Sequence, residues 1–205
     1  MALMQTEENK RVDTRLKILE KGAEIIHLKG YNHTGIQEIL NAAGIPKGSF
    51  YNYFKSKEDF GLQVIDFFTD LFPGMIGDIL ESESLTPVEK LDHILARFLT
   101  VFRERDFCYG CPIGNLSQEM GDLSQAFRAK LKNAFDSMAE IYTGLIQKAQ
   151  SQGEISDDID AQKAAYFIVT SWHGALGHMK ILKSTEPLEN HRAMIMENVL
   201  RAGAE

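Results

Sequence analysis

Residues 43–58 read AGIPKGSFYNYFKSKE, and this stretch decides the fold that we predict for the first part of the chain. Gly44 can take the positive φ that a tight turn needs, because it has no Cβ atom. Pro46 suits the first turn of a helix, where its missing N–H would have no partner in any case. The stretch therefore predicts a tight turn that leads into a short helix.

Two further helices should precede this turn. The first has one apolar stripe at helical spacing, made of Leu16, Leu19, Ala23 and Ile26. It should end near Gly30, and Thr34 can cap the start of a second short helix. Ile39 and Phe50 can then pack the second and third helices against the first. Three helices joined in this way form a helix-turn-helix unit, which we place at residues 10–56.

The third helix would present small and polar side chains outward. They are Lys47, Gly48, Ser49, Tyr51 and Asn52. The two small residues would let the backbone approach DNA closely. Lys47 and Asn52 can reach base edges or phosphates, and Tyr51 can bond to a phosphate. A helical hairpin with a glycine but no DNA role would give a similar pattern.

Charge is unevenly distributed along the chain. Residues 10–57 contain nine Lys and Arg but only four Asp and Glu, a net charge of +5. The whole chain carries −7, so the rest carries −12. A basic end on an acidic body would orient the molecule toward a polyanion. A chance cluster of solvated helix charges is the alternative.

The rest of the chain has helical periodicity and no alternating strand pattern of useful length. The expected helices run from 57 to about 72 (ending before Pro73), from a capping box at Thr86 to the break at 106–115, over 123–150, from the acidic residues Asp157, Asp158 and Asp160 to 182, and from Pro187 to the end of the chain. The sequence therefore predicts an all-α protein of about nine helices.

Length and composition narrow the class of protein. The chain has 205 residues, of which 44% are hydrophobic and 25% charged, as in an ordinary globular protein. No apolar run approaches the length of a membrane helix, and the first residues lack a signal-peptide core, so no membrane contact is expected. Two cysteines indicate a reducing cytoplasm rather than a disulfide framework. We expect no cofactor.

The stretch from Gly30 to Glu58, with its core AG-I-x-KGS-F-Y-x-YF-x-SKE, closely resembles the DNA-binding domain of TetR/AcrR-family transcriptional regulators. The likeness covers about residues 10–60. It implies an all-helical, dimeric, ligand-responsive transcription factor, most often a repressor. An N-terminal helix-turn-helix domain at 10–56 would be followed by a helical ligand-binding and dimerisation domain at 57–205.

The resemblance also implies which residues meet DNA. They are Thr34 and Gln37 of the second helix, Lys47, Ser49, Tyr51, Asn52 and Tyr53 of the third, and Lys57 at the start of the fourth. Two positions depart from the family's pattern. Pro46 stands where Ser or Thr is common, and Gly35 replaces a bulkier, often hydroxylated residue, so a phosphate contact at either position is in doubt.

Phenylalanines are concentrated early in the second predicted domain, where nine of the chain's 12 lie between residues 60 and 135. An aromatic-lined ligand pocket between helices is one interpretation, and an ordinary hydrophobic core is the other. The pocket candidates are Phe67, Phe68, Phe98, Phe102, Phe107, Phe127 and Phe135.

Residues 107–116 read FCYGCPIGNL and form the most unusual segment of the chain. Cys108 and Cys111 could be a redox pair, or half of a zinc site to which His93 and His173 would have to come. No second cysteine pair or close histidine pair is present, so we expect no metal.

The GC-P-I-GNL part of this segment is similar to one in a TetR subgroup of electrophile-sensing repressors, which implies that Cys111 is the sensor. A cysteine at the N-terminal end of a helix could have a pKa lowered by the helix dipole and react as a thiolate. A small buried residue in a turn is the alternative.

Small residues line the penultimate predicted helix and permit close approach of another helix. The resemblance suggests that this helix and the last one form a four-helix dimer interface, with packing inside one chain as the alternative. The interface candidates are Ile168, Ser171, Trp172, Ala175, Met179, Met194, Ile195 and Val199.

Three functions follow from these observations. The first is a homodimeric repressor that binds a pseudo-palindromic operator in double-stranded DNA and is released by a small-molecule inducer or a cysteine-reactive electrophile. The second is a dithiol oxidoreductase that uses Cys108 and Cys111, although the α/β pattern of a thioredoxin-like protein is absent. The third is a helical adaptor with no DNA role.

Overall fold

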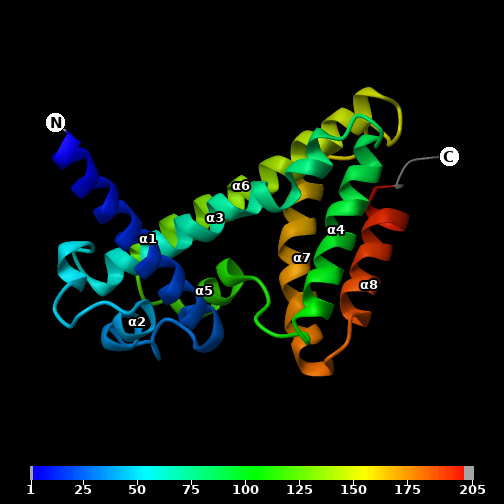
Figure 1. Ribbon diagram of the computed structural model, residues 1–205. Coiled ribbons are helices and arrows are strands. Elements are labelled where there is room, and N and C mark those ends of the chain that lie inside the picture. The colour runs from blue at the N-terminus through cyan, green and yellow to red at the C-terminus, as the bar shows by residue number, and fades with distance from the viewer. Residues whose placement is uncertain (1, 201–205) are drawn as a thin grey trace. The chain divides into compact units, whose positions relative to one another are not determined.

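The computed structural model describes residues 2–200, and side chains from residue 11 onward. Its elements, labelled in Figure 1 where there is room, are α1 (Ala2–Lys29), α2 (Ile36–Ala43), the 3₁₀ turn η1 (Phe50–Asn52), α3 (Lys57–Glu81), α4 (Pro87–Glu104), α5 (Pro112–Met120), α6 (Gln125–Ser151), α7 (Ala161–Leu182), α8 (Glu186–Met194) and the π-helical turn η2 (Ile195–Val199). No strand occurs in residues 2–200, which confirms the all-α prediction. The predicted extension of the last helix beyond residue 200 lies outside the described residues.

The chain forms two compact units. The first comprises Met1–Phe68 and Asn115–Leu131, and the second Thr69–Gly114 and Lys132–Glu205. Helices α3, α5 and α6 each contribute residues to both units. These units differ from the predicted domains, a DNA-binding domain at 10–56 and a regulatory domain at 57–205. That functional boundary stays a prediction.

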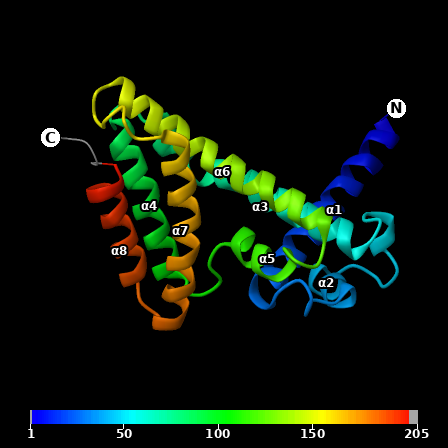
Figure 2. The ribbon, with the colours of Figure 1, turned by 180° about the vertical axis from the view of Figure 1, so that it is seen from behind.

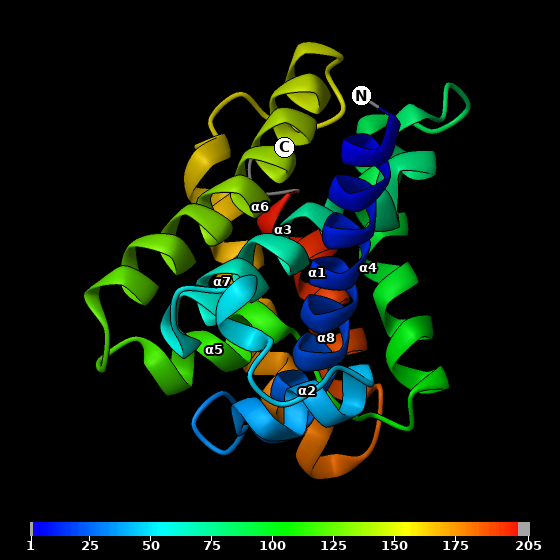
Figure 3. The same ribbon diagram turned by 60° about the vertical axis from the view of Figure 1, so that its left-hand side comes forward.

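The core of the first unit is formed by α1, α2 and the residues that lead into α3. Figure 3 shows α1 running down to the turn that enters α2. The buried members of α1 and α2 are Ile18, Leu19, Ala23, Ile26, Ile39, Leu40 and Ala43. Phe50, Phe54 and Phe60 complete this core, and the ring centroids of Phe54 and Phe60 lie 4.8 Å apart. The predicted packing of three segments is therefore present.

The third segment is not the α-helix that the sequence predicts. A turn at residues 46–49, closed by the Ser49 N–H donating to the Pro46 carbonyl at 3.3 Å, is followed by η1. Gly48 has a φ of +91°, which no residue of a right-handed helix adopts. The helix expected from Pro46 is therefore reduced to a turn and one 3₁₀ turn.

The end of helix α3 differs from the prediction. The sequence places its end before Pro73, but the helix continues through this proline to Glu81. A proline inside a helix costs about 3 kcal/mol. The residues beyond it include Ile76 and Ile79, which are buried in the second unit, so continuing the helix buries apolar surface that offsets this cost.

The second unit places α4, α7 and α8 side by side, as both Figure 1 and the view from behind in Figure 2 show. The predicted capping box of α4 is present, because the Thr86 side chain accepts from the Glu89 N–H and the Glu89 carboxylate accepts from the Thr86 N–H. Asp160 caps α7 by accepting from the Lys163 N–H at 3.0 Å. The predicted limits of α6 and the predicted end of α7 are correct to within two residues, and α7 begins directly after Asp160, the last of the three acidic residues predicted to start it.

None of the helices between residues 2 and 200 combines the length and the apolar character needed to cross a membrane.

Candidate nucleic-acid interface and thiol site

The segment after α2 has buried aromatic rings next to exposed polar side chains. Phe50 and Phe54 are each 1% exposed, and their ring centroids lie 5.2 Å apart. Between them, Tyr51 is 67% exposed. Asn52 is also exposed, and its carbonyl accepts from the Arg11 guanidinium at 2.9 Å. The buried rings thus hold a polar strip at the surface.

The other residues of this strip lie on either side of Phe50. Lys47 and Gly48 are exposed, and Ser49 and Tyr53 are half-buried. All five residues expected to face outward from this segment are therefore at least partly accessible. Their DNA contacts stay a prediction, because the structure contains the protein alone.

The start of α2 differs from the prediction. Gly35, not Thr34, occupies the N-cap position, and it has no side chain that could cap. Thr34 is 1% exposed, and its hydroxyl donates to the Gly30 carbonyl at 2.7 Å. The prediction of a Thr34 cap was wrong, and its predicted phosphate contact has to compete with this buried hydrogen bond. Gln37 is exposed on α2.

A carboxylate that the sequence analysis missed holds the turn between α1 and α2. Glu119 of α5 accepts from the backbone N–H of Tyr31 at 2.8 Å and of Asn32 at 2.6 Å. Gly30 precedes these residues with a φ of +88°, as predicted for a helix end, and a Cβ atom there would lie 2.8 Å from a Glu119 oxygen. Glycine is required at position 30 on both counts. No sequence pattern links position 119 to this turn.

Lys57 sits beside the same turn. Its Nζ lies 4.4 Å from the centroid of the Tyr31 ring, within the range of a cation–π contact. Burial lowers the pKa of Lys57, and the Glu119 carboxylate opposes that shift. Burial, with Glu58 and Glu119, raises the pKa of Tyr31 to about 12. Lys57 is thus a half-buried cation at the start of α3, where the resemblance places a phosphate contact.

The aromatic residues of the second unit form a chain of ring contacts. Phe72 and Phe98 are stacked with centroids 5.8 Å apart, and Phe98 meets Trp172 edge-on at 6.5 Å. Phe98, Phe107 and Trp172 pack, only partly buried, on a core formed by Leu99, Phe102, Leu176, Met179 and Leu188.

The seven pocket candidates divide into core and partly exposed residues. Phe102 and Phe127 are 6% and 0% exposed, so both serve as core, and Phe127 packs against Tyr31 in the first unit. Phe67 and Phe68 belong to the first unit and are half-buried, as are Phe98, Phe107 and Phe135 of the second. The aromatic-lined ligand pocket stays a prediction.

Cys111 lies at the N-terminal end of a helix, as the sequence predicts, but this helix, α5, begins at Pro112, inside the predicted break at 106–115. Burial raises the pKa of its thiol, although the backbone N–H groups of Ile113 and Gly114 and the charge of Lys180 pull in the opposite direction. The predicted lowering of this pKa by the helix N-terminus was therefore wrong, because desolvation outweighs it. Tyr142 is a neighbour, whose own pKa burial raises.

His173 of α7 faces the first turn of α5. A Cβ atom on Gly114 would lie 2.1 Å from its Cδ2, and its ring centroid is 4.9 Å from that of Phe135. Nδ1 lies 2.6 Å from the Val169 carbonyl, which assigns the ring proton to Nδ1, and burial lowers the pKa of the imidazole. The buried Nε2 has no hydrogen-bond partner among the described residues.

The possible zinc ligands do not assemble into a site. His93 is exposed on α4, whereas His173 is turned into the second unit. Nowhere in residues 11–200 do three His, Cys, Asp or Glu side chains come together as a metal site would require.

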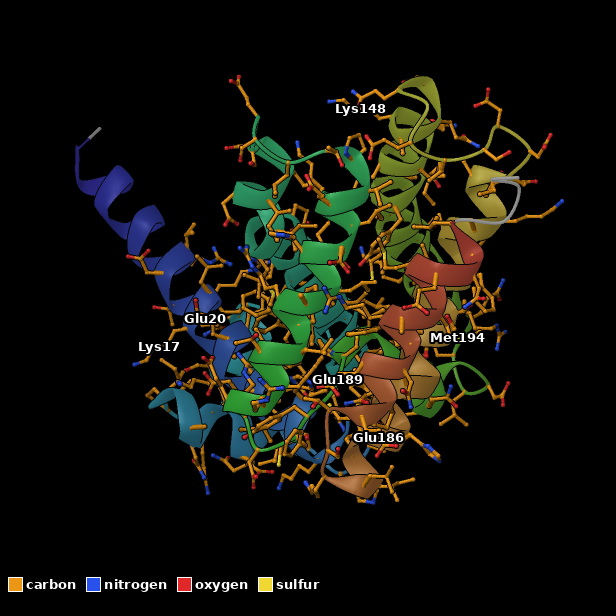
Figure 4. The ribbon with its side chains drawn as sticks, turned by 90° about the vertical axis from the view of Figure 1, so that its right-hand side faces the viewer. Lys17, Glu20, Lys148, Glu186, Glu189 and Met194 are labelled. Atoms are coloured by element: carbon orange, nitrogen blue, oxygen red, sulfur yellow. The ribbon has the colours of Figure 1, made fainter. Side chains whose placement is uncertain are left out.

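The residues predicted at the dimer interface also fall into two groups, some buried within one chain and others accessible. Ile168, Met179 and Ile195 are at most 1% exposed within one chain, so packing inside the chain, the alternative interpretation, applies to them. Ser171 bonds to His191 Nε2 at 2.8 Å. Met194 is 57% exposed, and Figure 4 shows it at the surface of α8 with Glu186 and Glu189. The remaining candidates, Trp172, Ala175 and Val199, are half-buried.

The exposed side of α7 carries apolar residues that the prediction omitted. Phe167 and Ile181 are 52% and 76% exposed, with the exposed Gly174 between them at helical spacing. Positions 167, 174 and 181 are seven residues apart, which places them on one side of a helix. The sequence therefore contained the signal for this apolar side.

Comparison with known proteins identifies the family to which this fold belongs. Residues 18–64 match the family model described as bacterial regulatory proteins, tetR family, and residues 87–195 match that of the Tetracyclin repressor-like C-terminal domain. The HTH-type transcriptional repressor DhaR of Mycobacterium sp. (strain GP1) is 36% identical over 191 residues, which cover 93% of this chain and 94% of DhaR. This chain belongs to the TetR family.

Other TetR-family proteins are similar over nearly their whole length. The HTH-type transcriptional repressor NemR of Escherichia coli (strain K12) is 29% identical over 196 residues, which cover 94% of this chain and 96% of NemR. The crystal structure of reduced E. coli NemR has a TM-score of 0.82 at 26% identity, covering 92% of this chain and 98% of that one. A regulatory protein TetR from Rhodobacter sphaeroides also has a TM-score of 0.82, at 33% identity over 88% of this chain and 96% of that one.

Glu119→Gln tests how the first unit is held together. Glutamine keeps the size of the side chain but replaces one acceptor oxygen by a donor, which leaves one of the two backbone N–H groups unpaired. We expect the free energy of unfolding in urea to fall by about 1–3 kcal/mol. The control is Glu24→Gln, because Glu24 is exposed and pairs only with Lys21 in the described structure, and it should change this free energy by less than about 1 kcal/mol. Equal effects of the two substitutions would contradict the role of Glu119.

Proposed function

We propose that this TetR-family protein is a homodimeric transcriptional repressor that acts in the cytoplasm on a pseudo-palindromic operator. The observation that carries the proposal is the polar strip between Phe50 and Phe54, with Lys47, Tyr51 and Asn52 exposed above buried rings. A groove-reading segment needs such side chains on a rigid support, since base contacts give specificity only when the backbone is fixed. The two rings provide that support.

Charge supports DNA as the partner. The net charge of +5 in residues 10–57, on a chain of −7, brings the positive end to the phosphates. Lys47 and Lys55 are exposed next to the polar strip, and neither has an ion-pair partner in the described structure. Both ammonium groups would therefore bind phosphates without first giving up a protein contact.

A second copy of the chain would cover the exposed apolar side of α7 and α8. Phe167, Ile181 and Met194 are more than half exposed there, and an apolar patch of this kind is more stable when covered. A two-fold axis between two such surfaces would pair two DNA-binding heads, and the paired heads would read half-sites about 34 Å apart.

The proposal predicts how lysines contribute to DNA binding. We expect Lys47→Ala and Lys57→Ala to weaken binding to a genomic fragment captured by the purified protein. Each should reduce the slope of log K against log salt concentration by about 0.9, because one phosphate contact fewer releases fewer counterions. Titrations at several salt concentrations measure this slope.

The matched control is Lys163→Ala on α7, because Lys163 is 87% exposed but lies in the second unit. It should leave both the affinity and the slope unchanged. A Lys47→Ala slope equal to that of the parent protein would contradict the proposed contact, and a captured fragment that binds no better than random DNA would contradict the repressor.

We further propose that binding of a small molecule in the second unit, or reaction of Cys111 with an electrophile, releases the operator. The sulfur of Cys111 accepts from the N–H groups of Ile113 and Gly114, so an adduct there removes the cap of α5. Release would follow if the altered state cannot fit two heads into successive grooves. NemR and DhaR are named repressors, which supports repression over activation.

Cys111→Ser tests the thiol. Serine is a good helix cap, so operator binding should stay unchanged, but release by N-ethylmaleimide should be blunted. In the parent protein the rate of release should rise about tenfold per pH unit up to the thiol pKa. The reason is that burial raises this pKa and keeps the thiolate scarce at neutral pH. Unchanged release from the serine variant, measured by loss of DNA-bound fluorescence anisotropy, would contradict the sensor.

A further inference from the structure

Cys108 and Cys111 lie in different environments, although only two residues separate them. Cys111 lies half-buried directly before α5, where it packs against the core of the second unit, and burial raises the pKa of its thiol. Cys108 is half-buried as a residue, and its hydrogen bonds lie at the exposed surface. The two thiols of this segment therefore differ in their surroundings, which the spacing alone does not show.

Cys108 has a cationic partner from a distant part of the chain. Lys183, which follows the last residue of α7, donates from its Nζ to the Cys108 Sγ at 3.5 Å. The same sulfur lies 3.4 Å from the Asp106 carbonyl, which accepts the S–H of the neutral thiol. An ammonium that donates to sulfur stabilises negative charge on it, and the thiolate is the reactive form of cysteine.

The backbone on both sides of this contact is held in a rare conformation. Asp106, Phe107 and Tyr109 have φ values of +52°, +56° and +69°, and Lys183 has +51°. Such angles are unfavourable in residues other than glycine, so the surrounding structure has to hold them. Phe107 packs against the core of the second unit, which fixes the segment that presents Cys108.

From this arrangement we propose that Cys108 and Lys183 form a second electrophile-reactive site, separate from Cys111, which reacts first at neutral pH. The ligand class is a small soft electrophile with a C=C bond conjugated to a carbonyl. The inference rests on the proposed function only for its regulatory meaning, since the reaction itself needs no DNA. The chain would then have two thiols that respond at different doses of the same compound.

The reaction is an addition of the thiol across the double bond. The thiol first releases its proton to water, and Sγ then forms a bond to the β-carbon of the electrophile. The π electrons move toward the carbonyl as an enolate, which takes a proton at its α-carbon from the Lys183 ammonium. Lys183 regains a proton from water, so the net change is the addition of S–H to C=C with no oxidant or reductant.

The test is the rate of labelling of each cysteine by N-ethylmaleimide at pH 7, followed by mass spectrometry of the peptides that contain Cys108 and Cys111. We expect Cys108 to be labelled at least about tenfold faster than Cys111, because its sulfur has an adjacent cation at the exposed surface, whereas Cys111 packs against the core of the second unit. Labelling of Cys111 first, or of both cysteines at the same rate, would overturn the proposal.

Two lysine variants form matched controls for each other. Lys183→Gln should slow the labelling of Cys108 by about three- to tenfold and leave Cys111 unchanged, because it removes one nearby charge. Lys180→Gln, which removes the charge beside Cys111, should leave Cys108 unchanged. No slowing of Cys108 in Lys183→Gln would overturn the role of the lysine.

The outcome is independent of the repressor proposal, because labelling is measured without DNA. A protein that binds no operator but labels Cys108 first would contradict the proposed function alone. Operator binding with the opposite order of labelling would contradict only this inference.

Discussion

The burial of Phe50, Phe54 and Phe60 in one ring cluster is the constraint on which the first unit depends. These rings are at most 1% exposed, and all three pairs of centroids lie 4.8–5.6 Å apart. Full burial of one such side chain is worth roughly 1.5–3 kcal/mol, so the cluster fixes the path of the backbone between α2 and α3. The direction of Tyr51 follows from that path, because a neighbour of two buried rings in a tight turn can only face outward.

Helix α5 links this unit to the chemistry of the thiol segment. Its nine residues begin directly after the capping sulfur of Cys111, and its penultimate residue is Glu119. The carboxylate of Glu119 holds the turn that enters α2, and Gly114 in the first turn of the helix leaves room for the ring of His173. The same short helix therefore follows Cys111 and contains the carboxylate that holds the turn into α2.

The sequence was sufficient for much of the fold because its signals are local. The capping box at Thr86 and the left-handed Gly30 each depend on residues within one turn, and the structure has both. The predicted end of α3 at Pro73 was wrong for the opposite reason. A proline is a local signal, but burial of Ile76 and Ile79 in the second unit outweighs it.

The candidate site was harder to predict from sequence, because its decisive contacts join distant residues. Glu119 lies 87 residues from Asn32, and Lys183 lies 75 residues from Cys108, so neither contact has a sequence pattern. The helix expected at Pro46 also shows what the sequence could not predict. Family resemblance identified the residues of that segment, but the φ of +91° at Gly48 makes it a turn.

A hydroxyl-radical footprint of the purified protein on a captured genomic fragment tests the central claim most directly. Two chains that each present the strip around Tyr51 should protect two backbone patches in successive turns of the duplex, about 34 Å apart and related by a dyad. A single patch, or protection without dyad symmetry, would contradict the account.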